Sequence, residues 1–263
     1  RHSKAKTNHR LPLRFGPKLE QLVADGTLRH AAKLRAIVEI PQVEHVEVHC
    51  VRLPASPSWR KLTEFRKGNA MPLDLVTVPC LQDNYAYLIH DAATGATAVI
   101  DVPDAGPILN ALAQRNWKAS HILITHHHDD HIQGVQALAA ATGARVIGAK
   151  ADVHRLPPLD ESVAEGDTIR IGLEEGHVID VSGHTVGHIA FHFPASKLAF
   201  TADSLMALGC GRLFEGTAAQ MWGSLSKLAA LPADTVICSG HEYTQTNGRF
   251  AITIEPNNPD LQA

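Results

Sequence analysis

One short segment constrains this chain more than any other: the run HILIT at 121–125 leads directly into HHHDDH at 126–131. A short, mainly apolar run of this kind predicts a buried strand. The polar residues that follow it would then lie in a loop held by that strand. Imidazole nitrogens and carboxylate oxygens are ligands that suit zinc, iron or manganese. The segment therefore predicts a metal-binding loop at the end of a strand. The alternative is a solvated histidine-rich loop with no ligand.

Side-chain alternation divides the histidines of this loop between two directions. An extended backbone directs successive side chains to opposite sides, so His126 and His128 would point one way and His127 the other. A turn after them can bring Asp130 and His131 toward the same centre. We therefore expect His127 to lie outside the ligand set.

Three further groups of polar residues also follow predicted strands. They are SGHTVGH at 182–188, TAD at 201–203 and SGHE at 239–242. The end of a rigid strand is a good position from which to present a ligand. Any one of these groups alone is better explained as a hydrogen-bonded turn. Together with HHHDDH, they supply enough ligands for two metal ions.

Short apolar runs and helical segments follow one another irregularly from Met71 onward. The predicted strands are 73–78, 85–90, 97–102, 121–125, 168–171, 177–181, 189–193, 197–201 and 235–239. The predicted helices are 107–116, 132–142, 218–231 and one more near the end of the chain. This order favours a layered α/β protein with mixed or largely antiparallel sheets and disfavours a Rossmann fold.

Charge is distributed unevenly along the chain. Residues 1–70 contain 14 Lys and Arg against 6 Asp and Glu, whereas residues 71–263 contain 10 against 21. The chain begins with Arg1, and its strongly patterned part begins at Met71. We therefore expect residues 1–70 to be a basic extension that is separate from the rest.

Within this extension, a helix is predicted at 17–37 and a strand at 43–53. The basic stretch lacks interleaved aromatic residues, so we expect no nucleic-acid partner. No run of about 18 apolar residues is present, which excludes a helical membrane span. The cysteines form no CxxC pair, and no apolar signal segment is recognisable, so we expect a reduced, cytoplasmic setting.

Five motifs, in order along the chain, carry a resemblance to a known family: THHHDDH, SGHTVGH, FTADSL, GCGRLFEG and GHEYT. The first is typical of the metallo-β-lactamase superfamily. GCGRLFEG followed by GHEYT resembles the glyoxalase II (hydroxyacylglutathione hydrolase) branch of it. The resemblance runs from Met71 to the last residue and implies a four-layer αββα sandwich. Residues 71–243 would form the catalytic domain.

The same resemblance implies that glyoxalase II chains continue into a small helical domain. We expect residues 244–263 to be the start of that substrate-binding region, truncated here. The metal site would then be intact, and the affinity for substrate weakened. We also expect a monomer.

Carried over motif by motif, the resemblance implies seven ligands for two divalent ions. They are His126, His128 and His184 for one ion, Asp130, His131 and His241 for the other, and Asp203 between them. Zinc is the expected metal, with iron and manganese as alternatives. Asp130 would also orient the attacking water. We expect His188 and His192, like His127, to be structural, and Asp129 to lie outside the ligand set.

The substrate contacts that the resemblance implies lie in two motifs. Arg212 would bind a glutathione carboxylate, and Tyr243 the peptide part of glutathione. Phe214 stands where the family often has a tyrosine. The implied activity is hydrolysis of S-lactoylglutathione-type thioesters to glutathione and a 2-hydroxy acid, as in methylglyoxal detoxification. The alternatives are a mononuclear-iron persulfide dioxygenase, a lactonase or β-lactamase, and a chain with residual metal binding only.

Overall fold

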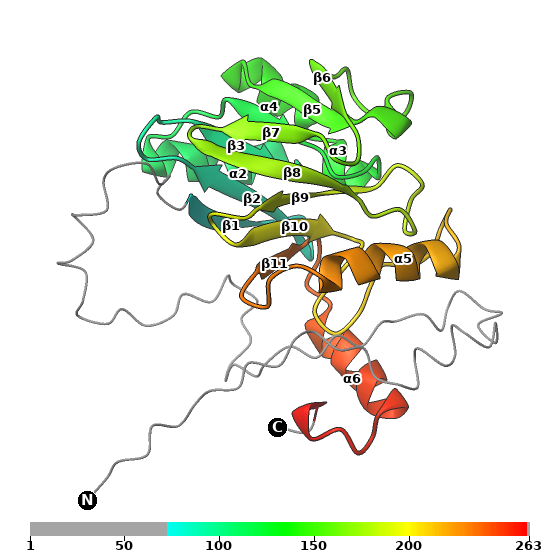
Figure 1. The fold of residues 1–263 in the computed structure, drawn as a ribbon. Helices are drawn as coiled ribbons and strands as arrows, with labels where there is room; N and C mark the ends of the chain where they lie inside the picture. The colour runs from blue at the N-terminus through cyan, green and yellow to red at the C-terminus, as the bar shows by residue number, and fades with distance from the viewer. Residues whose placement is uncertain (1–72, 262–263) are drawn as a thin grey trace, which may run out of the picture.

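The computed structural model describes residues 73–261 (Figure 1). The helix and the strand predicted within 1–70 lie outside the described residues. Two β-sheets lie face to face, and helices cover the outer face of each. The prediction of a four-layer αββα sandwich with mixed sheets is therefore confirmed.

Within the described residues, the first sheet has six strands that pair in chain order, antiparallel from the first to the third and parallel from the third onward. They are β1 (Asp74–Cys80), β2 (Asn84–His90), β3 (Thr97–Ile100), β4 (His121–Leu123), β5 (Arg145–Ala149) and β6 (Glu161–Val163).

The second sheet has five strands in the described part of the chain, and all of its pairs are antiparallel except the parallel pair of β10 and β11. They are β7 (Thr168–Ile171), β8 (Glu174–Asp180), β9 (Ile189–Phe193), β10 (Leu198–Ala202) and β11 (Val236–Ser239).

In the described part of the chain, the helices lie in the connections between strands and after the last strand. They are α2 (Ala105–Arg115), α3 (Asp129–Ile132), α4 (Val135–Thr142), α5 (Ala218–Ala229) and α6 (Thr244–Ile254), with short 3₁₀ helices η3 (Lys150–Asp152) and η4 (Pro259–Leu261). None of these helices has the length and apolar character needed to cross a membrane.

Three apolar clusters fill the spaces between the four layers. The cluster between the two sheets contains Phe191, Phe193 and Phe200. A second cluster packs α2 and α4 against the first sheet, with Leu138 at 0% exposure. The third packs α5 against the second sheet through residues such as Met221. Burial of these apolar surfaces is the main force that holds the layers together.

Alternation along β2 explains how one strand serves two of these clusters. Tyr87 and Ile89 face the cluster between the sheets, whereas Ala86 and Leu88 face the cluster beneath the helices. Because both faces are buried, the strand is a nearly continuous apolar run. The sequence predicts it at 85–90, and the structure begins it one residue earlier.

Two sequence predictions about local structure are wrong. The helix predicted at 132–142 is divided into α3 and α4, because the chain turns at Gly134, where an added Cβ would lie 2.9 Å from the carbonyl oxygen of Val102. The strands β5 and β6 are missing from the prediction. β5 contains Gly148, where an added Cβ would lie 2.9 Å from the end of the Leu156 side chain, and a glycine weakens a strand pattern.

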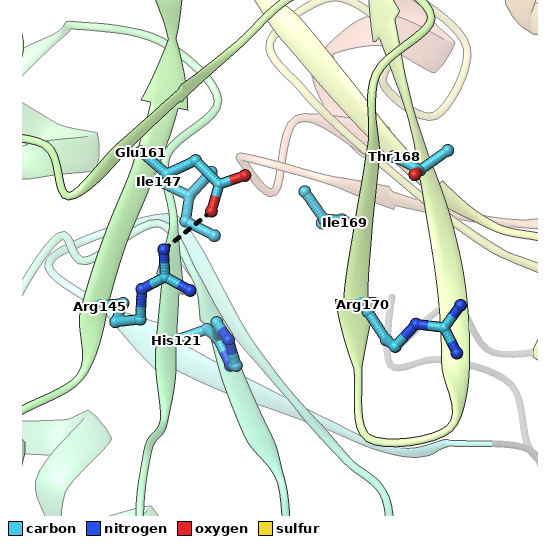
Figure 2. Close-up of a pocket in the computed structure, with 7 residues that line it drawn as sticks. All are labelled: His121, Arg145, Ile147, Glu161, Thr168, Ile169 and Arg170. Carbon is cyan, nitrogen blue, oxygen red and sulfur yellow. Dashed lines mark hydrogen bonds and ion pairs between the residues drawn. The ribbon is translucent and has the colours of Figure 1, made fainter.

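A cavity of about 210 Å³ lies near the N-terminal ends of β4 and β5, where β7 passes opposite them (Figure 2). Its charged groups are already paired. Arg145 contacts Glu161 at 3.0 Å, and Arg170 contacts Glu175 at 3.2 Å. This cavity lies at the opposite end of β4 from HHHDDH.

Candidate metal centre

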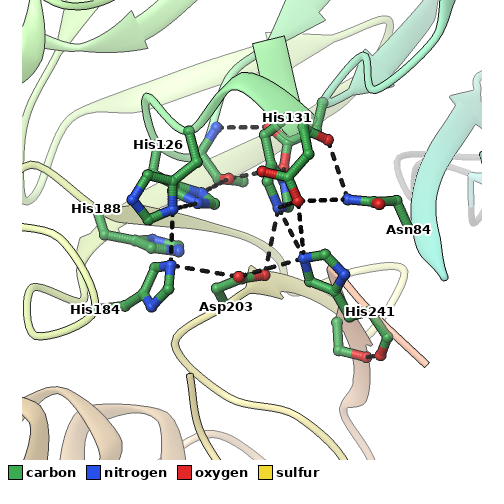
Figure 3. A network of polar contacts seen from close by, with 12 residues as sticks. Asn84, His126, His131, His184, His188, Asp203 and His241 are labelled. Carbon is green, nitrogen blue, oxygen red and sulfur yellow. Dashed lines mark hydrogen bonds and ion pairs between the residues drawn. The ribbon is translucent and has the colours of Figure 1, made fainter. Parts of the chain in front are cut away.

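Loops that follow β4, β8, β10 and β11 meet at one edge of the sandwich (Figure 3). They carry the seven side chains that the sequence predicts as ligands. The backbone is extended at His128 (φ −64°, ψ 141°), and α3 begins directly after it. This change of direction brings Asp130 and His131 into the centre from the same loop. Segments that are far apart in the chain meet here: the Nε2 atoms of His131 and His241 are 3.3 Å apart.

The first cluster contains three histidines, His126, His128 and His184. Nδ1 of His128 lies 3.1 Å from Nε2 of His126 and 3.0 Å from Nε2 of His184. Burial lowers the pKa of all three imidazoles, and that of His126 falls well below its ordinary value. The neutral imidazole is the form that binds a cation. The three histidines can therefore bind a cation through neutral imidazole nitrogens.

The second cluster contains Asp130, His131 and His241. Nε2 of His241 lies 3.3 Å from Oδ2 of Asp130, and Nε2 of His131 lies 3.9 Å from the same oxygen. One carboxylate and two imidazoles thus face a common point. The two clusters together contain nitrogen and oxygen donors only, which is the donor set of zinc, iron and manganese sites.

Asp203 lies between the clusters and contacts both. Its Oδ2 lies 3.3 Å from Nε2 of His184 and 3.4 Å from Nε2 of His241, and its Oδ1 lies 3.4 Å from Nε2 of His131. The carboxylate is buried, and Oδ1 has no hydrogen-bond partner among the described residues. An Oδ1 atom without a donor, in a buried group, is an acceptor that a cation would satisfy. The residues therefore fit a dinuclear metal site.

Electrostatics in the second cluster also favour a cation. Burial acts to lower the pKa of His131, but Asp203 and Asp101 outweigh burial and raise that pKa well above its ordinary value. Burial is likewise outweighed at His241, where hydrogen bonds to Asp130 and Asp203 raise the pKa to about 10. The carboxylates thus attract positive charge, which protons supply when no cation is bound. A metal ion held here would displace these protons.

Asp101 supports this centre and was not predicted from the sequence. Its Oδ1 accepts a hydrogen bond from the backbone N–H of Thr125 (2.9 Å), and its Oδ2 accepts one from the Thr125 hydroxyl (2.7 Å). The same Oδ2 lies 2.8 Å from Nδ1 of His131, so the ring is held with Nε2 toward the centre. A carboxylate on the far nitrogen of a ligand histidine fixes its orientation and raises its basicity. Asp101 has φ 55°, which ends β3 at Ile100 instead of at 102.

The turn between β1 and β2 supports the second cluster from the other side. Nδ1 of His241 lies 3.0 Å from Oδ1 of Asp83. The side-chain amide of Asn84 donates to Oδ2 of Asp130 (2.9 Å) and to its backbone carbonyl (3.1 Å). Both residues were missed. In the sequence they are an Asp-Asn pair between two strands, which looks like ordinary turn residues.

The three histidines that the sequence analysis places outside the ligand set, His127, His188 and His192, belong to neither cluster. The ring of His188 is buried and stacks on that of His126, with centroids 4.5 Å apart. His192 lies on β9 near His177, with centroids 6.5 Å apart. Nδ1 of His127 lies 3.1 Å from Oδ2 of Asp152, outside both clusters.

Residues 209–216, which we call the substrate loop, carry two of the predicted substrate contacts beside the centre. The ring of Phe214 is 59% exposed and meets His128 and His184 edge-on, at centroid distances of 5.4 and 5.3 Å. The Arg212 guanidinium lies 5.3 Å from the Phe214 ring centroid. The third predicted contact, Tyr243, stacks on His241 at 4.9 Å. All three exposed side chains therefore surround the candidate centre.

Glu215 of the substrate loop gives a test of pH dependence. Hydrogen bonds from Arg155 hold the pKa of Glu215 at about 2, below its ordinary 4.5. Because the folded-state pKa is the lower one, the ionised carboxylate stabilises the folded state, fully above pH 4.5 and less as pH falls toward 2. Compared with Glu215→Gln, the wild type should be more stable to urea by an amount that is constant near neutral pH and shrinks below pH 4.5.

The control is Glu161→Gln, which removes a more exposed carboxylate from the Arg145 ion pair at the other end of β4. It should change the unfolding free energy less, because exposed ion pairs contribute about 0–1 kcal/mol. A Glu215 difference that stays the same at every pH, or grows as pH falls, would contradict the expectation.

Comparison with known proteins places this geometry in a family. A family model described as metallo-beta-lactamase superfamily matches residues 82–241. A hydroxyacylglutathione hydrolase from Cereibacter sphaeroides (strain ATCC 17025 / ATH 2.4.3) is 71% identical over 191 residues, which cover 73% of this chain and 75% of the relative.

Two solved structures are also similar. BLEG-1, a B3 metallo-beta-lactamase, has a TM-score of 0.61 at 20% identity, over 72% of this chain and 100% of that one. TTHA1623 in a di-iron-bound form has a TM-score of 0.56 at 26% identity, over 64% of this chain and 92% of that one. The fold, the clusters at the strand ends and the sequence matches agree: this chain belongs to the metallo-β-lactamase superfamily and, within it, to the hydroxyacylglutathione hydrolases.

Proposed function

We propose that this chain hydrolyses 2-hydroxyacyl thioesters of glutathione with the help of two divalent metal ions. The observation that carries the proposal is the position of Asp203, whose Oδ2 lies beside His184 of the first cluster and His241 of the second, and whose Oδ1 lies beside His131. Relatives that share the fold and are 60–71% identical carry the name hydroxyacylglutathione hydrolase, which supports the substrate class.

The proposed ligands are the seven side chains of the two clusters and of Asp203. When bound, two divalent ions supply an activated water at neutral pH and a Lewis acid for the carbonyl oxygen. Zinc is the proposed metal, because histidine nitrogen and carboxylate oxygen are ligands that suit it well. Iron is a reasonable alternative, since the similar TTHA1623 is described in a di-iron-bound form. The protein holds these donors in place through Asp101, Asp83 and the carbonyl oxygen of Arg212, which lies 2.6 Å from Nδ1 of His184.

Asp130 has the proposed catalytic role beyond metal binding. Its carboxylate lies on the open side of the second cluster, with 42% of the side chain exposed. Hydrogen bonding to His241 lowers its pKa, so it is ionised at neutral pH and can accept a hydrogen bond from the attacking water. Asn84 fixes its Oδ2, and the orientation of the water would follow.

The substrate would lie across the substrate loop and Tyr243. The Arg212 guanidinium suits a glutathione carboxylate, Tyr243 suits the peptide part, and Phe214 offers an apolar wall beside the first cluster. Attack of water on the thioester carbonyl breaks the C–S bond and yields glutathione and a 2-hydroxy acid. The leaving thiol has an ordinary pKa of about 8.5, so the reaction needs no strong general acid.

A single-metal oxidation is supported less well. A mononuclear site uses one cluster, whereas Asp130, His131 and His241 form a second complete group, with all ligand atoms within 4.8 Å of one another. This second group is the feature that favours hydrolysis by two ions over persulfide dioxygenation by one.

Removal of metal tests the proposal directly. The purified chain is expected to contain two metal ions by elemental analysis and to hydrolyse S-D-lactoylglutathione in a spectrophotometric assay. Dialysis against a chelator should abolish turnover and lower the melting temperature, because ions that bind only the folded chain stabilise it. Adding back zinc, iron or manganese should restore both, and the elemental analysis of the purified chain shows which of these metals it carries.

The matched control is His121→Ala, a histidine at the other end of β4 that lines the cavity of Figure 2. It should leave metal content and turnover unchanged, whereas His131→Ala should reduce both. A wild-type chain that binds two metals and leaves the thioester intact has another substrate. A chain with a single iron and thiol-dependent oxygen uptake is a dioxygenase instead.

A further inference from the structure

Arg155 lies between two carboxylates that come from different loops. Its Nε donates to Oδ1 of Asp152 at 3.1 Å, and Asp152 is the last residue of η3. On its other side, Nη1 donates to Oε1 of Glu215 and Nη2 donates to Oε2 at 3.1 Å. Glu215 belongs to the substrate loop. A guanidinium can hold both oxygens of a carboxylate at once, which fixes their relative orientation.

This network also reaches the two loops that carry the first metal cluster. Oδ2 of Asp152 lies 3.1 Å from Nδ1 of His127, which stands between His126 and His128 in the chain. Oε2 of Glu215 accepts a hydrogen bond from the backbone N–H of Val186 (2.7 Å), two residues after His184. The polar contacts therefore run from the HHHDDH loop through Arg155 to the substrate loop, and from there to the His184 loop.

The packing between these loops leaves little free space. A Cβ at Gly187 would lie 2.2 Å from Cγ of Asp152, and a Cβ at Gly211 would lie 2.1 Å from the carbonyl oxygen of Asp203. Backbone bonds add to these contacts, since the N–H of Gly211 donates to that same oxygen at 2.8 Å. Main chain also holds the loop on both sides of Glu215, where the N–H of Phe214 donates to the carbonyl oxygen of His184 (3.2 Å) and that of Gly216 donates to the carbonyl oxygen of Gly183 (3.1 Å). The ion pair with Arg155 adds a side-chain anchor at Glu215 itself.

Asp152 is 1% exposed and therefore depends on its partners. A buried carboxylate without a compensating charge is costly, and the Arg155 guanidinium supplies that charge, while Nδ1 of His127 adds a polar contact. Arg155 itself is only partly buried, with 28% of its side chain exposed.

We infer that Arg155 is a positioning residue for substrate binding. By holding Glu215 to Asp152, it keeps the substrate loop in the conformation that presents Arg212 and Phe214 to the glutathione part of the substrate. The inference rests on the proposed function and names a determinant of affinity within it. If the loop is released, part of the binding energy is used to order it again, and affinity falls while the chemical step is preserved.

The test compares Arg155→Met and Glu215→Gln with Arg155→Lys and a control. The first two variants should raise KM for S-D-lactoylglutathione about tenfold, because only a fraction of the molecules then have an ordered loop. Their kcat and their content of two metals should stay close to wild type. Arg155→Lys keeps the charge without the paired contacts and should lie between them and wild type. Arg145→Met, which breaks a more exposed ion pair at the other end of β4, should match wild type.

A second measurement does not depend on turnover. S-hexylglutathione is a thioether that lacks the thioester bond cleaved in the proposed reaction. Its dissociation constant should rise in Arg155→Met and Glu215→Gln in parallel with KM. Amide hydrogen exchange should become faster within residues 209–216 and remain unchanged in β2, which is buried on both faces.

The outcomes separate the two proposals. If the wild type neither cleaves the thioester nor binds the thioether, the proposed function fails. If the wild type does both and the two variants leave KM and the dissociation constant unchanged, the inference about Arg155 is wrong while the function stands. A fall in kcat together with loss of metal would also overturn it, since Arg155 would then act on the ligand loops. If Arg155→Met does not fold, Glu215→Gln and Arg155→Lys decide the question.

Discussion

Replacing Asp203 by asparagine is expected to lower thioester hydrolysis on the order of 10³-fold, which corresponds to about 4 kcal/mol of lost transition-state stabilisation. The amide preserves the shape of the side chain but removes its negative charge. In the structure, the two Asp203 oxygens lie 3.3–3.4 Å from His184, His241 and His131. An asparagine brings no negative charge to the point where Oδ2 of Asp203 now lies beside both clusters, so it would be a weaker shared ligand.

Metal content distinguishes this expectation from simple misfolding. Asp203→Asn should retain about one metal ion or fewer per chain by elemental analysis, with unchanged far-ultraviolet circular dichroism. Asp129→Asn is the control, because Asp129 is an exposed neighbouring carboxylate in the same loop as the proposed ligands. It should keep two metals and normal turnover. Full metal content in Asp203→Asn with wild-type kcat would rule out a shared ligand at this position.

The largest effect on stability is expected from Phe200→Ala, with a loss of about 3–5 kcal/mol in the free energy of unfolding. Phe200 is fully buried in the cluster between the two sheets. Its ring centroid lies 5.5 Å from that of Tyr87 on the first sheet and 6.1 Å from that of Phe193 on the second. Truncation would leave a cavity at the point where the sheets touch, and the surrounding strands cannot collapse into it completely.

Urea unfolding at a fixed metal concentration measures this effect, because bound ligands would otherwise change the apparent stability. The control is Phe214→Ala, the same substitution at an exposed site, which should cost less than about 1 kcal/mol. It should affect substrate affinity instead. Similar losses in the two variants would mean that the space between the sheets is not the dominant core.

The ligand set could be proposed from sequence because each member lies in a short motif at the end of a strand. HHHDDH follows β4 and Asp203 follows β10, and nearly all residues of these two strands are buried, so apolar runs reveal them. SGH follows β8, in which buried and more exposed residues alternate. The convergence of the loops was an inference from resemblance, and the structure supplies the distances between them. Arg212, Phe214 and Tyr243 lie beside the clusters, and their contacts with substrate stay a prediction.

The supporting residues could not be predicted for a physical reason. Asp101 acts through a left-handed backbone conformation and a bond to His131, which is 30 positions away. Asn84 contacts Asp130 across 46 positions. Arg155 joins Glu215 across 60 positions. None of these pairs has a recognisable spacing in the sequence, because the partners come from different strands of the first sheet or, for Arg155 and Glu215, from different sheets. The strand β5 was missed because its glycine at 148 interrupts the apolar pattern.

The origin of the ligands has a consequence for how the molecule acquires its metals. His131 and His241 are 110 positions apart, and they become neighbours only after β11 has paired with β10 across the whole length of α5. Contacts between residues so far apart in the chain are slow to form, because closing a long segment costs entropy before the new contacts stabilise the structure. We therefore expect the two ions to be held together only once the scaffold has formed, unlike the ion of a zinc finger, around which the chain folds. On this expectation, metal supply to a cell would govern activity more than it governs whether the chain folds.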